Sequence, residues 1–146
     1  MFGRVEISRN VTIAGPPAEV WAVFMDLETW PTWTASMRQV RRLDEGPLQV
    51  GSRVEIAQPG FPKAVWDVTD LEPERSFTWE NAAPGLRSAG HHEVRAEGAG
   101  SVVTLRLSQS GPLAGLMGLV FGRRNRRYVD LEADGLKARV EAAPGG

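Results

Sequence analysis

The residues best suited to proton chemistry are the two adjacent histidines, His91 and His92. The imidazole ring titrates near neutral pH and serves as a general acid or base. In an alternating strand only one of two neighbours faces inward, and the spacing from Gly90 and Val94 assigns His92 to the inner face. His92 is therefore the candidate catalytic residue. The alternative is a core histidine satisfied by a backbone carbonyl, since the sequence places no carboxylate beside it.

Metal and thiol chemistry have little support in this sequence. It contains no cysteine and only two histidines, and no acidic cluster stands at ligand spacing near them. Zinc sites need three or four ligands from His, Cys or carboxylate side chains. We therefore expect neither a bound metal nor a cofactor.

A second group of candidate residues is polar but shares a strand face with apolar neighbours. Apolar alternation ends in Gln58, Asn81 and Gln109 on three segments, and Ser88 shares a face with His92. Buried polar groups are costly unless they are hydrogen-bonded, so a packed core would not select them. They indicate a cavity in which a few polar groups orient a ligand.

The longest helical signal covers residues 110–142 and opens with Ser-Gly-Pro, where serine can cap and proline fits the first turn. Its apolar residues share one sector at helical spacing: Leu113, Met117, Phe121, Tyr128, Leu131, Leu136 and Ala138. Gly115, Gly118 and Gly122 each cost about 1 kcal/mol relative to alanine in a helix. We expect these glycines to leave room for a cavity beneath the helix.

A basic run crowds one turn of the same helix. It consists of Arg123, Arg124, Arg126 and Arg127. Such a run is either a solvated helix face, partly neutralised by Asp130 and Asp134, or a contact for lipid or phosphate groups.

Arg124 lies beside Phe121 and Tyr128 if the helix is straight, and it then reaches the cavity or its rim. A kink near Gly122 instead turns it into solvent. A buried guanidinium needs a partner, and the candidates are Glu132, two turns along the same helix, and, less favourably, Asp70. The cation otherwise snorkels to water or binds a ligand carboxylate or phosphate.

The rest of the sequence predicts strands and short helices. Residues 4–13 alternate as a half-buried strand, and two short helices follow at 18–27 and 28–33. Trp30 and Trp33 fit core positions, but Trp33 lies where the chain leaves the second helix, and the alternative is that it lines an opening. Six further strands are predicted at 37–43, 52–58, 64–71, 75–81, 86–97 and 101–109.

Composition limits the class of protein. The 146 residues show no composition break, which predicts a single domain over 1–146. A net charge of -1 argues against nucleic-acid binding. No apolar run reaches the length of a membrane span and no signal-peptide core opens the chain, so we expect a cytoplasmic protein without integral membrane association. The expected oligomeric state is a monomer or a homodimer.

Several segments resemble a known family. They are GPPAEVWAVFMDLETWPTW at 15–33, VGSRVEI at 50–56, LEPERSFTW at 71–79 and the closing helix around Leu136 and Lys137. Together they resemble the SRPBCC superfamily of START-like, Bet v 1-like and polyketide cyclase/dehydrase-like proteins. The resemblance covers nearly the whole chain, but its motifs are structural and specify fold more than function.

The resemblance implies an α+β helix-grip fold. In this fold a seven-stranded antiparallel curved sheet wraps around a long C-terminal helix, two short helices follow the first strand, and a tunnel receives an apolar ligand. Members include lipid and sterol carriers, hormone receptors and aromatase/cyclases. The family has no universal catalytic residue, so none is carried over to this sequence.

Three functions remain open. The first is binding of a small hydrophobic molecule, lipid-like or polyketide-like, in the cavity. The second is a polyketide cyclase or dehydratase that uses His92 for proton transfer, and the third is a protein-interaction module. The candidate ligand-binding residues are Trp33, Gln58, Trp66, Trp79, Asn81, Ser88, His92, Gln109, Phe121, Arg124 and Tyr128.

Overall fold

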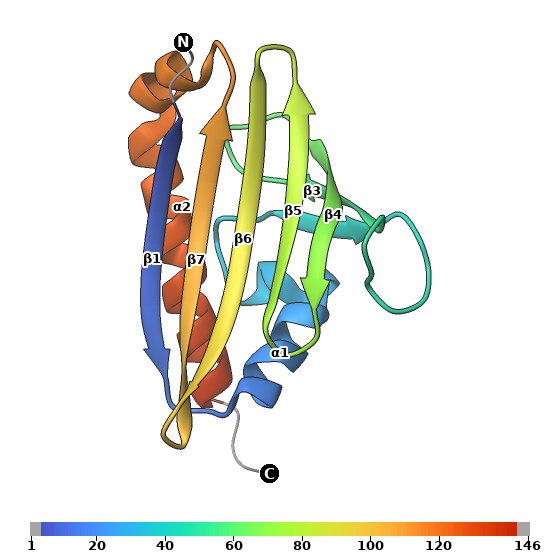
Figure 1. Ribbon diagram of the computed structural model, residues 1–146, viewed down its shortest axis with the longest axis vertical. Coiled ribbons are helices and arrows are strands. Elements are labelled where there is room, and N and C mark those ends of the chain that lie inside the picture. The colour runs from blue at the N-terminus through green and yellow to red at the C-terminus, as the bar shows by residue number, and fades with distance from the viewer. Residues whose placement is uncertain (1–3, 143–146) are drawn as a thin grey trace.

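A single antiparallel sheet forms one layer of the computed structural model, which describes residues 4–142 (Figure 1). The strands are β1 (Val5–Ile13), β2 (Gln39–Arg42), β3 (Arg53–Ala57), β4 (Ala64–Glu72), β5 (Ser76–Ala83), β6 (Leu86–Glu97) and β7 (Gly100–Ser110). Their order in the sheet is β1-β7-β6-β5-β4-β3-β2, with every neighbouring pair antiparallel. The predicted seven-stranded antiparallel sheet is confirmed.

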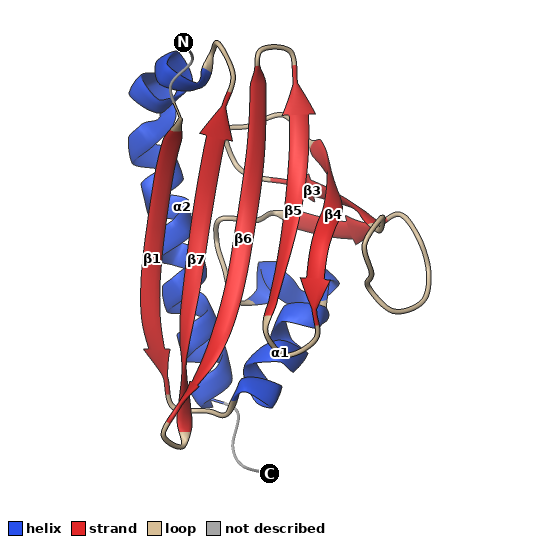
Figure 2. Ribbon diagram, in the orientation of Figure 1, coloured by secondary structure: helices blue, strands red, loops and turns tan. Residues whose placement is uncertain are grey.

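Three helical segments lie on one face of this sheet (Figure 2). They are α1 (Pro17–Met25), the 3-10 helix η1 (Leu27–Thr32) and α2 (Ala114–Ala142). Proline is tolerated at the start of α1 because the first helical N–H groups have no partner within the helix. Figure 1 shows α2 running along β1 and β7, with α1 at the opposite end of the sheet from the start of α2. The helix-grip architecture is therefore confirmed.

The start of the long helix was predicted too early. Ser110 ends β7 and pairs with Arg87 of β6, so it does not cap a helix. A turn follows, in which the Leu113 amide donates to the carbonyl of Gly85 over 2.9 Å, and α2 begins at Ala114. The residue that local sequence signals assign to the helix cap therefore belongs to the sheet, where it pairs with β6.

The packed core fills the end of the molecule that α1 and η1 cover. Phe24, Trp30 and Phe77 are fully buried, and their ring centroids lie 5.6–6.3 Å apart. The indole of Trp30 donates to the carbonyl of Phe24 over 3.1 Å, so the buried N–H is satisfied. The aromatic side chains of the 15–33 segment thus act mainly as core residues.

The two halves of α2 have different surroundings. In the second half, Ala133, Leu136 and Val140 are buried against the core. In the first half, the inner face of the helix carries Met117 and Phe121, which border open space. No helix among residues 4–142 is long and apolar enough to cross a bilayer.

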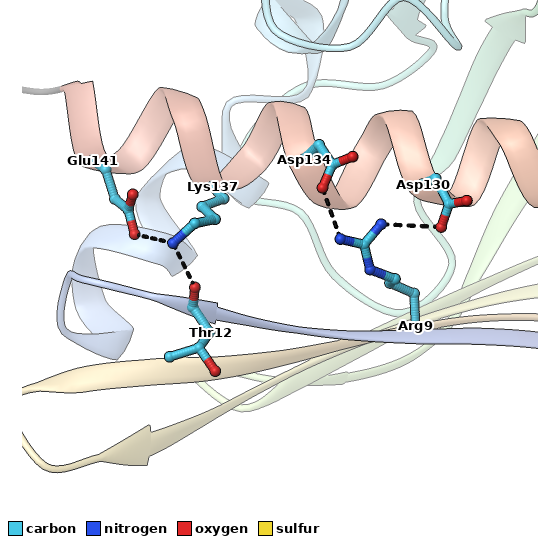
Figure 3. Close-up of polar contacts among 6 residues, drawn as sticks. All are labelled: Arg9, Thr12, Asp130, Asp134, Lys137 and Glu141. Carbon is cyan, nitrogen blue, oxygen red and sulfur yellow. Dashed lines mark hydrogen bonds and ion pairs between the residues drawn. The ribbon is translucent and has the colours of Figure 1, made fainter.

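Ion pairs fasten the second half of α2 to β1 (Figure 3). The guanidinium of Arg9 donates to Asp130 over 3.0 Å and to Asp134 over 2.8 Å. Lys137 donates to the carbonyl of Thr12 over 2.9 Å on the same strand. Asp130 and Asp134, which were expected to neutralise part of the basic run of the helix, thus form their ion pairs with Arg9, and one guanidinium offsets only one of their two charges.

Candidate functional site

A cavity of about 550 Å³ opens between the sheet and the first half of α2. We call it the outer chamber. Its lining includes Gln58, Trp66, Asn81, Ser88, Leu107, Gln109, Met117, Phe121 and Asn125. The connection between β3 and β4 closes one side with residues 60–63. Its volume lies within the range of about 300–1,000 Å³ that is typical of small-molecule sites.

A smaller inner chamber of about 80 Å³ continues from the outer one. The two chambers share Ile56, Gln58, Trp66, Leu107 and Asn125 in their walls. At its far end the inner chamber meets Trp79, His92 and Glu132. The site therefore narrows from a wide mouth to a small end that combines aromatic rings with two titratable groups.

Alternation along β6 places core, inner chamber and outer chamber in sequence. Val94 belongs to the core, His92 lines the inner chamber, and Ser88 lines the outer chamber. Gly90 lies between them, where an added Cβ would come within 2.7 Å of the indole nitrogen of Trp79. The absence of a side chain at Gly90 lets the Trp79 ring lie against β6.

His92 is held tightly at the end of the inner chamber. Its ring is 3% exposed and stacks on Phe77, with centroids 4.1 Å apart and an interplanar angle of 5°. The Nδ1 atom lies 3.3 Å from the carbonyl oxygen of Phe77. The Nε2 atom lies 3.5 Å from Oε2 of Glu132 on α2. The ring thus spans from the sheet to the helix.

Both partners of His92, a backbone carbonyl and a carboxyl group, can accept hydrogen bonds, which determines where the hydrogens of the ring can reside. A carbonyl oxygen only accepts, so Nδ1 carries the hydrogen in its contact with Phe77. The contact between Nε2 and Glu132 is then favourable when one further proton is bound, either on the ring or on the carboxyl group. His92 and Glu132 thus form a histidine–carboxylate contact at the chamber wall, a combination of groups that general acid–base catalysis uses.

The side chain of His91 projects from the other face of the sheet, although the residue also borders the inner chamber. Its Nδ1 atom is 2.9 Å from the hydroxyl of Thr78, and its Nε2 is 3.7 Å from Glu93. Burial lowers the pKa of His91 below its ordinary value, and the neighbouring His92 and Arg106 act in the same direction. The neutral ring is thus favoured at this position.

One face of α2 supplies the helical wall of the site. Phe121, Asn125, Tyr128 and Glu132 follow one another at helical spacing, and all four line one or both chambers. Asn125 is 9% exposed and stands where the chambers join. The sequence prediction omitted Asn125 and Glu132 from the site, although their spacing from Phe121 and Tyr128 was a usable signal.

The connection between β3 and β4 is tied to α2 by three contacts. The hydroxyl of Tyr128 donates to the carbonyl of Pro59, and Arg124 donates to the carbonyl of Gly60 over 3.0 Å. The ring of Phe61 lies 5.3 Å from that of Phe121. This connection therefore forms a strap across one side of the outer chamber.

Nine of the eleven predicted ligand-binding residues line the chambers. They are Gln58, Trp66, Trp79, Asn81, Ser88, His92, Gln109, Phe121 and Tyr128. Trp33 does not, because its ring packs 5.1 Å from that of Trp30 at the edge of the core. Gln109 donates to the hydroxyl of Ser88 over 3.1 Å, so two of these polar groups satisfy one another.

Arg124 lies outside both chambers. It is exposed, and its guanidinium carbon lies 5.4 Å from the ring centre of Phe61 and 5.7 Å from that of Phe121. Glu132, the expected partner, contacts His92 instead. The guanidinium thus reaches solvent at the strap, which is the snorkelling alternative.

The helix glycines do not hollow out the cavity, contrary to the prediction. An added Cβ at Gly118 would come within 3.0 Å of Val5, so this glycine lets β1 approach the helix. Gly115 and Gly122 face open space, with no atom within 4 Å of such a Cβ. The cavity instead results from the separation between the first half of α2 and strands β3 to β6.

Comparison of the sequence with known protein families gives one match. Residues 4–141 match the family described as polyketide cyclase/dehydrase and lipid transport. The match covers nearly the whole sequence, and the chain belongs to this family. No curated protein matches the sequence.

Solved structures support the fold. A hypothetical protein from Helicobacter pylori has a TM-score of 0.80 at 18% identity, over 93% of this chain and 88% of its own. Norcoclaurine synthase from Thalictrum flavum, in complex with dopamine and hydroxybenzaldehyde, gives 0.77 at 14% identity, over 99% and 91%. A Streptomyces aromatase/cyclase gives 0.69 at 20% identity, over 99% and 100%. These identities are low, so the likeness extends to the fold alone.

Proposed function

We propose that this protein binds a small hydrophobic molecule, lipid-like or polyketide-like, between the sheet and α2. The observation that carries the proposal is the outer chamber of about 550 Å³ and its continuation into the inner chamber. Trp66, Leu107, Met117 and Phe121 supply apolar wall, and burial of a ligand against them is favourable by about 25 cal/mol per Å².

A few polar groups give the ligand an orientation. Asn125 can donate and accept at the junction of the chambers, while His92 and Glu132 stand at the closed end. A ligand that carries a hydroxyl or carbonyl group at one end satisfies these side chains and leaves its apolar part in the outer chamber. The family description, which includes lipid transport, supports the same class of ligand.

Native mass spectrometry of freshly purified protein tests this proposal. We expect an added mass that solvent extraction releases, and rebinding of the extracted molecule to the stripped protein. A chain that carries no small molecule and binds no apolar fluorescent probe after purification would contradict the proposal.

A second function, proton transfer in a cyclase or dehydratase reaction, is favoured by one specific contact. His92 lies 3.5 Å from Glu132 at the chamber wall, so a protonated group can face the bound substrate. His92→Ala and Glu132→Gln should each lower turnover of the extracted molecule by roughly a hundredfold or more. His91→Ala is the control, because the side chain of His91 projects from the other face of the sheet. Equal, small effects of all three substitutions would remove the catalytic role.

A further inference from the structure

Large apolar side chains are exposed at the start of α2. Leu116 is 53% exposed, Leu119 is 84% exposed and Val120 is 59% exposed, with Leu113 just before the helix at 40%. Elsewhere in residues 4–142, Leu43 and Val50 are the other large apolar side chains exposed to this extent. Such a concentration within eight residues costs solubility and marks an interaction surface.

Arginines continue the same face of the helix. At 100° per residue, Leu116, Leu119, Val120, Arg123 and Arg127 fall within a sector of roughly 100°. We call these five residues the docking face. Arg124 and Arg126 flank it and donate to the carbonyls of Gly60 and Ser8. The face is therefore apolar toward the N-terminus of α2 and basic in the following turns.

Among residues 4–142, the acidic residues of the next turns form no ion pair with Arg123 or Arg127. Asp130 and Asp134 share the guanidinium of Arg9, and Glu132 faces His92 inside the cavity. Arg9 offsets one of the two aspartate charges, so the four arginines of residues 123–127 keep an excess of positive charge, although the chain as a whole has a net charge of -1. A local positive field beside exposed leucines requires a partner that offers negative charge and an apolar phase together.

We propose that the docking face binds the surface of an anionic lipid bilayer. Leu116, Leu119 and Val120 enter the boundary between headgroups and acyl chains, and Arg123 and Arg127 bind lipid phosphates. Interfacial helices lie in the plane of the bilayer surface, so the apolar and basic residues of one helix face reach the headgroup region side by side.

A second copy of the chain fits this face less well. In a two-fold contact the same patch is present on both partners, and because the docking face contains no acidic residue, a second copy offers its arginines no negative charge. A bilayer with anionic headgroups supplies the opposite charge, and long arginine side chains reach it by snorkelling. Charge complementarity therefore favours the lipid surface.

The docking face lies on the same turns of α2 that form the helical wall of the outer chamber. Met117 and Phe121, on the opposite side of the same turns, line the outer chamber. Docking would place the wall of the chamber directly above the lipid. Vesicle binding itself requires only the surface residues, so it does not depend on the proposed ligand-binding function.

Vesicle flotation tests the proposal with phosphatidylcholine vesicles that contain or lack phosphatidylserine. We expect the wild type to float with anionic vesicles and not with neutral ones, and added salt to weaken binding. The double variants Leu116→Ser/Leu119→Ser and Arg123→Glu/Arg127→Glu should each reduce binding at least tenfold. Since all four residues are exposed, both variants should keep the wild-type melting temperature within a few degrees.

A matched control separates this face from general charge effects. Arg75→Glu/Arg139→Glu makes the same change in net charge at two exposed positions, Arg75 between β4 and β5 and Arg139 in the last turn of α2. It should bind anionic vesicles as the wild type does. Loss of binding in this control equal to that of the docking-face variants would overturn the proposal, as would a wild type that does not float.

Light scattering distinguishes a second copy of the chain as the occupant. A wild-type dimer that Leu116→Ser/Leu119→Ser converts to a monomer, together with no flotation of the wild type, would assign the face to self-association and overturn the proposal. Binding of an apolar fluorescent probe in solution should be unchanged in the docking-face variants. A failure of docking is thereby distinguished from a failure of ligand binding.

Discussion

Gly135 of α2 lies directly against the backbone of Trp33, the residue that follows η1, and its replacement by alanine tests the packing that fixes the helix. An added Cβ would lie 1.9 Å from the carbonyl oxygen of Trp33 and 3.0 Å from its carbonyl carbon. Ordinary contacts at such a carbon are 3.4–4 Å, so helix and loop must separate by more than 1 Å. Because the opposing atoms belong to the backbone, a side-chain rotation cannot relieve the contact.

The expected magnitude is the difference between two effects. Alanine gains about 1 kcal/mol over glycine in a helix interior. Overpacking costs about 1–3 kcal/mol, and a contact with the backbone belongs at the upper end. We therefore expect Gly135→Ala to lower the free energy of unfolding by about 2 kcal/mol, or the melting temperature by about 6 °C.

Gly122→Ala is the matched control, since Gly122 lies inside the same helix with no atom within 4 Å of its added Cβ. It should raise the free energy of unfolding by up to about 1 kcal/mol. Urea denaturation followed by circular dichroism measures both variants, with an unchanged slope showing that only stability has altered. Equal stabilisation of both proteins would refute the close approach at Trp33.

Three further predictions concern charged side chains. Because burial lowers the pKa of His91, the unfolded chain binds a proton more readily below a pH of about 6.5, so the free energy of unfolding should fall as the pH decreases through that value. Urea denaturation should show this dependence weakened in His91→Gln. Arg9→Met removes the pairs with Asp130 and Asp134 and should cost about 1 kcal/mol in low salt, and less in high salt, by the same assay. Because Arg124 lies outside the chambers, Arg124→Met should affect the thermal shift caused by a fatty acid no more than the shift caused by its methyl ester. A loss of the thermal shift for the acid alone would contradict this.

Short-range patterns predicted most of the fold. Alternation identified the strands, and the apolar residues that share a strand face with Gln58, Asn81 and Gln109 face the interior as expected. The boundary at Ser110 was wrong because pairing with β6 is a long-range interaction that a local cap signal does not contain. Helix propensity likewise could not reveal that Gly118 serves the approach of Val5.

The sequence predicted more of the chamber-lining residues on the sheet than on the helix. Strand alternation assigns a face with a period of two, so one residue of known orientation fixes its neighbours. The contact between His92 and Glu132 joins residues that are distant in sequence, and only the placement of α2 over β6 brings them together. For Arg124 the sequence left cavity and solvent open, because a long cationic side chain can leave an apolar face and reach water, as it does here.

The proposed ligand site between the sheet and α2 can be tested directly by measuring the saturable binding of an apolar fluorescent probe to the wild type and to two leucine variants of β6. Ser88 lines the outer chamber, and Ser88→Leu fills part of it, whereas Ala89→Leu adds similar volume at the next residue on the other face of the sheet. The account predicts that the wild type and Ala89→Leu bind the probe, and that Ser88→Leu remains folded but loses at least tenfold in affinity. Absence of binding by the wild type, or equal affinity in all three proteins, would contradict a ligand site between the sheet and α2.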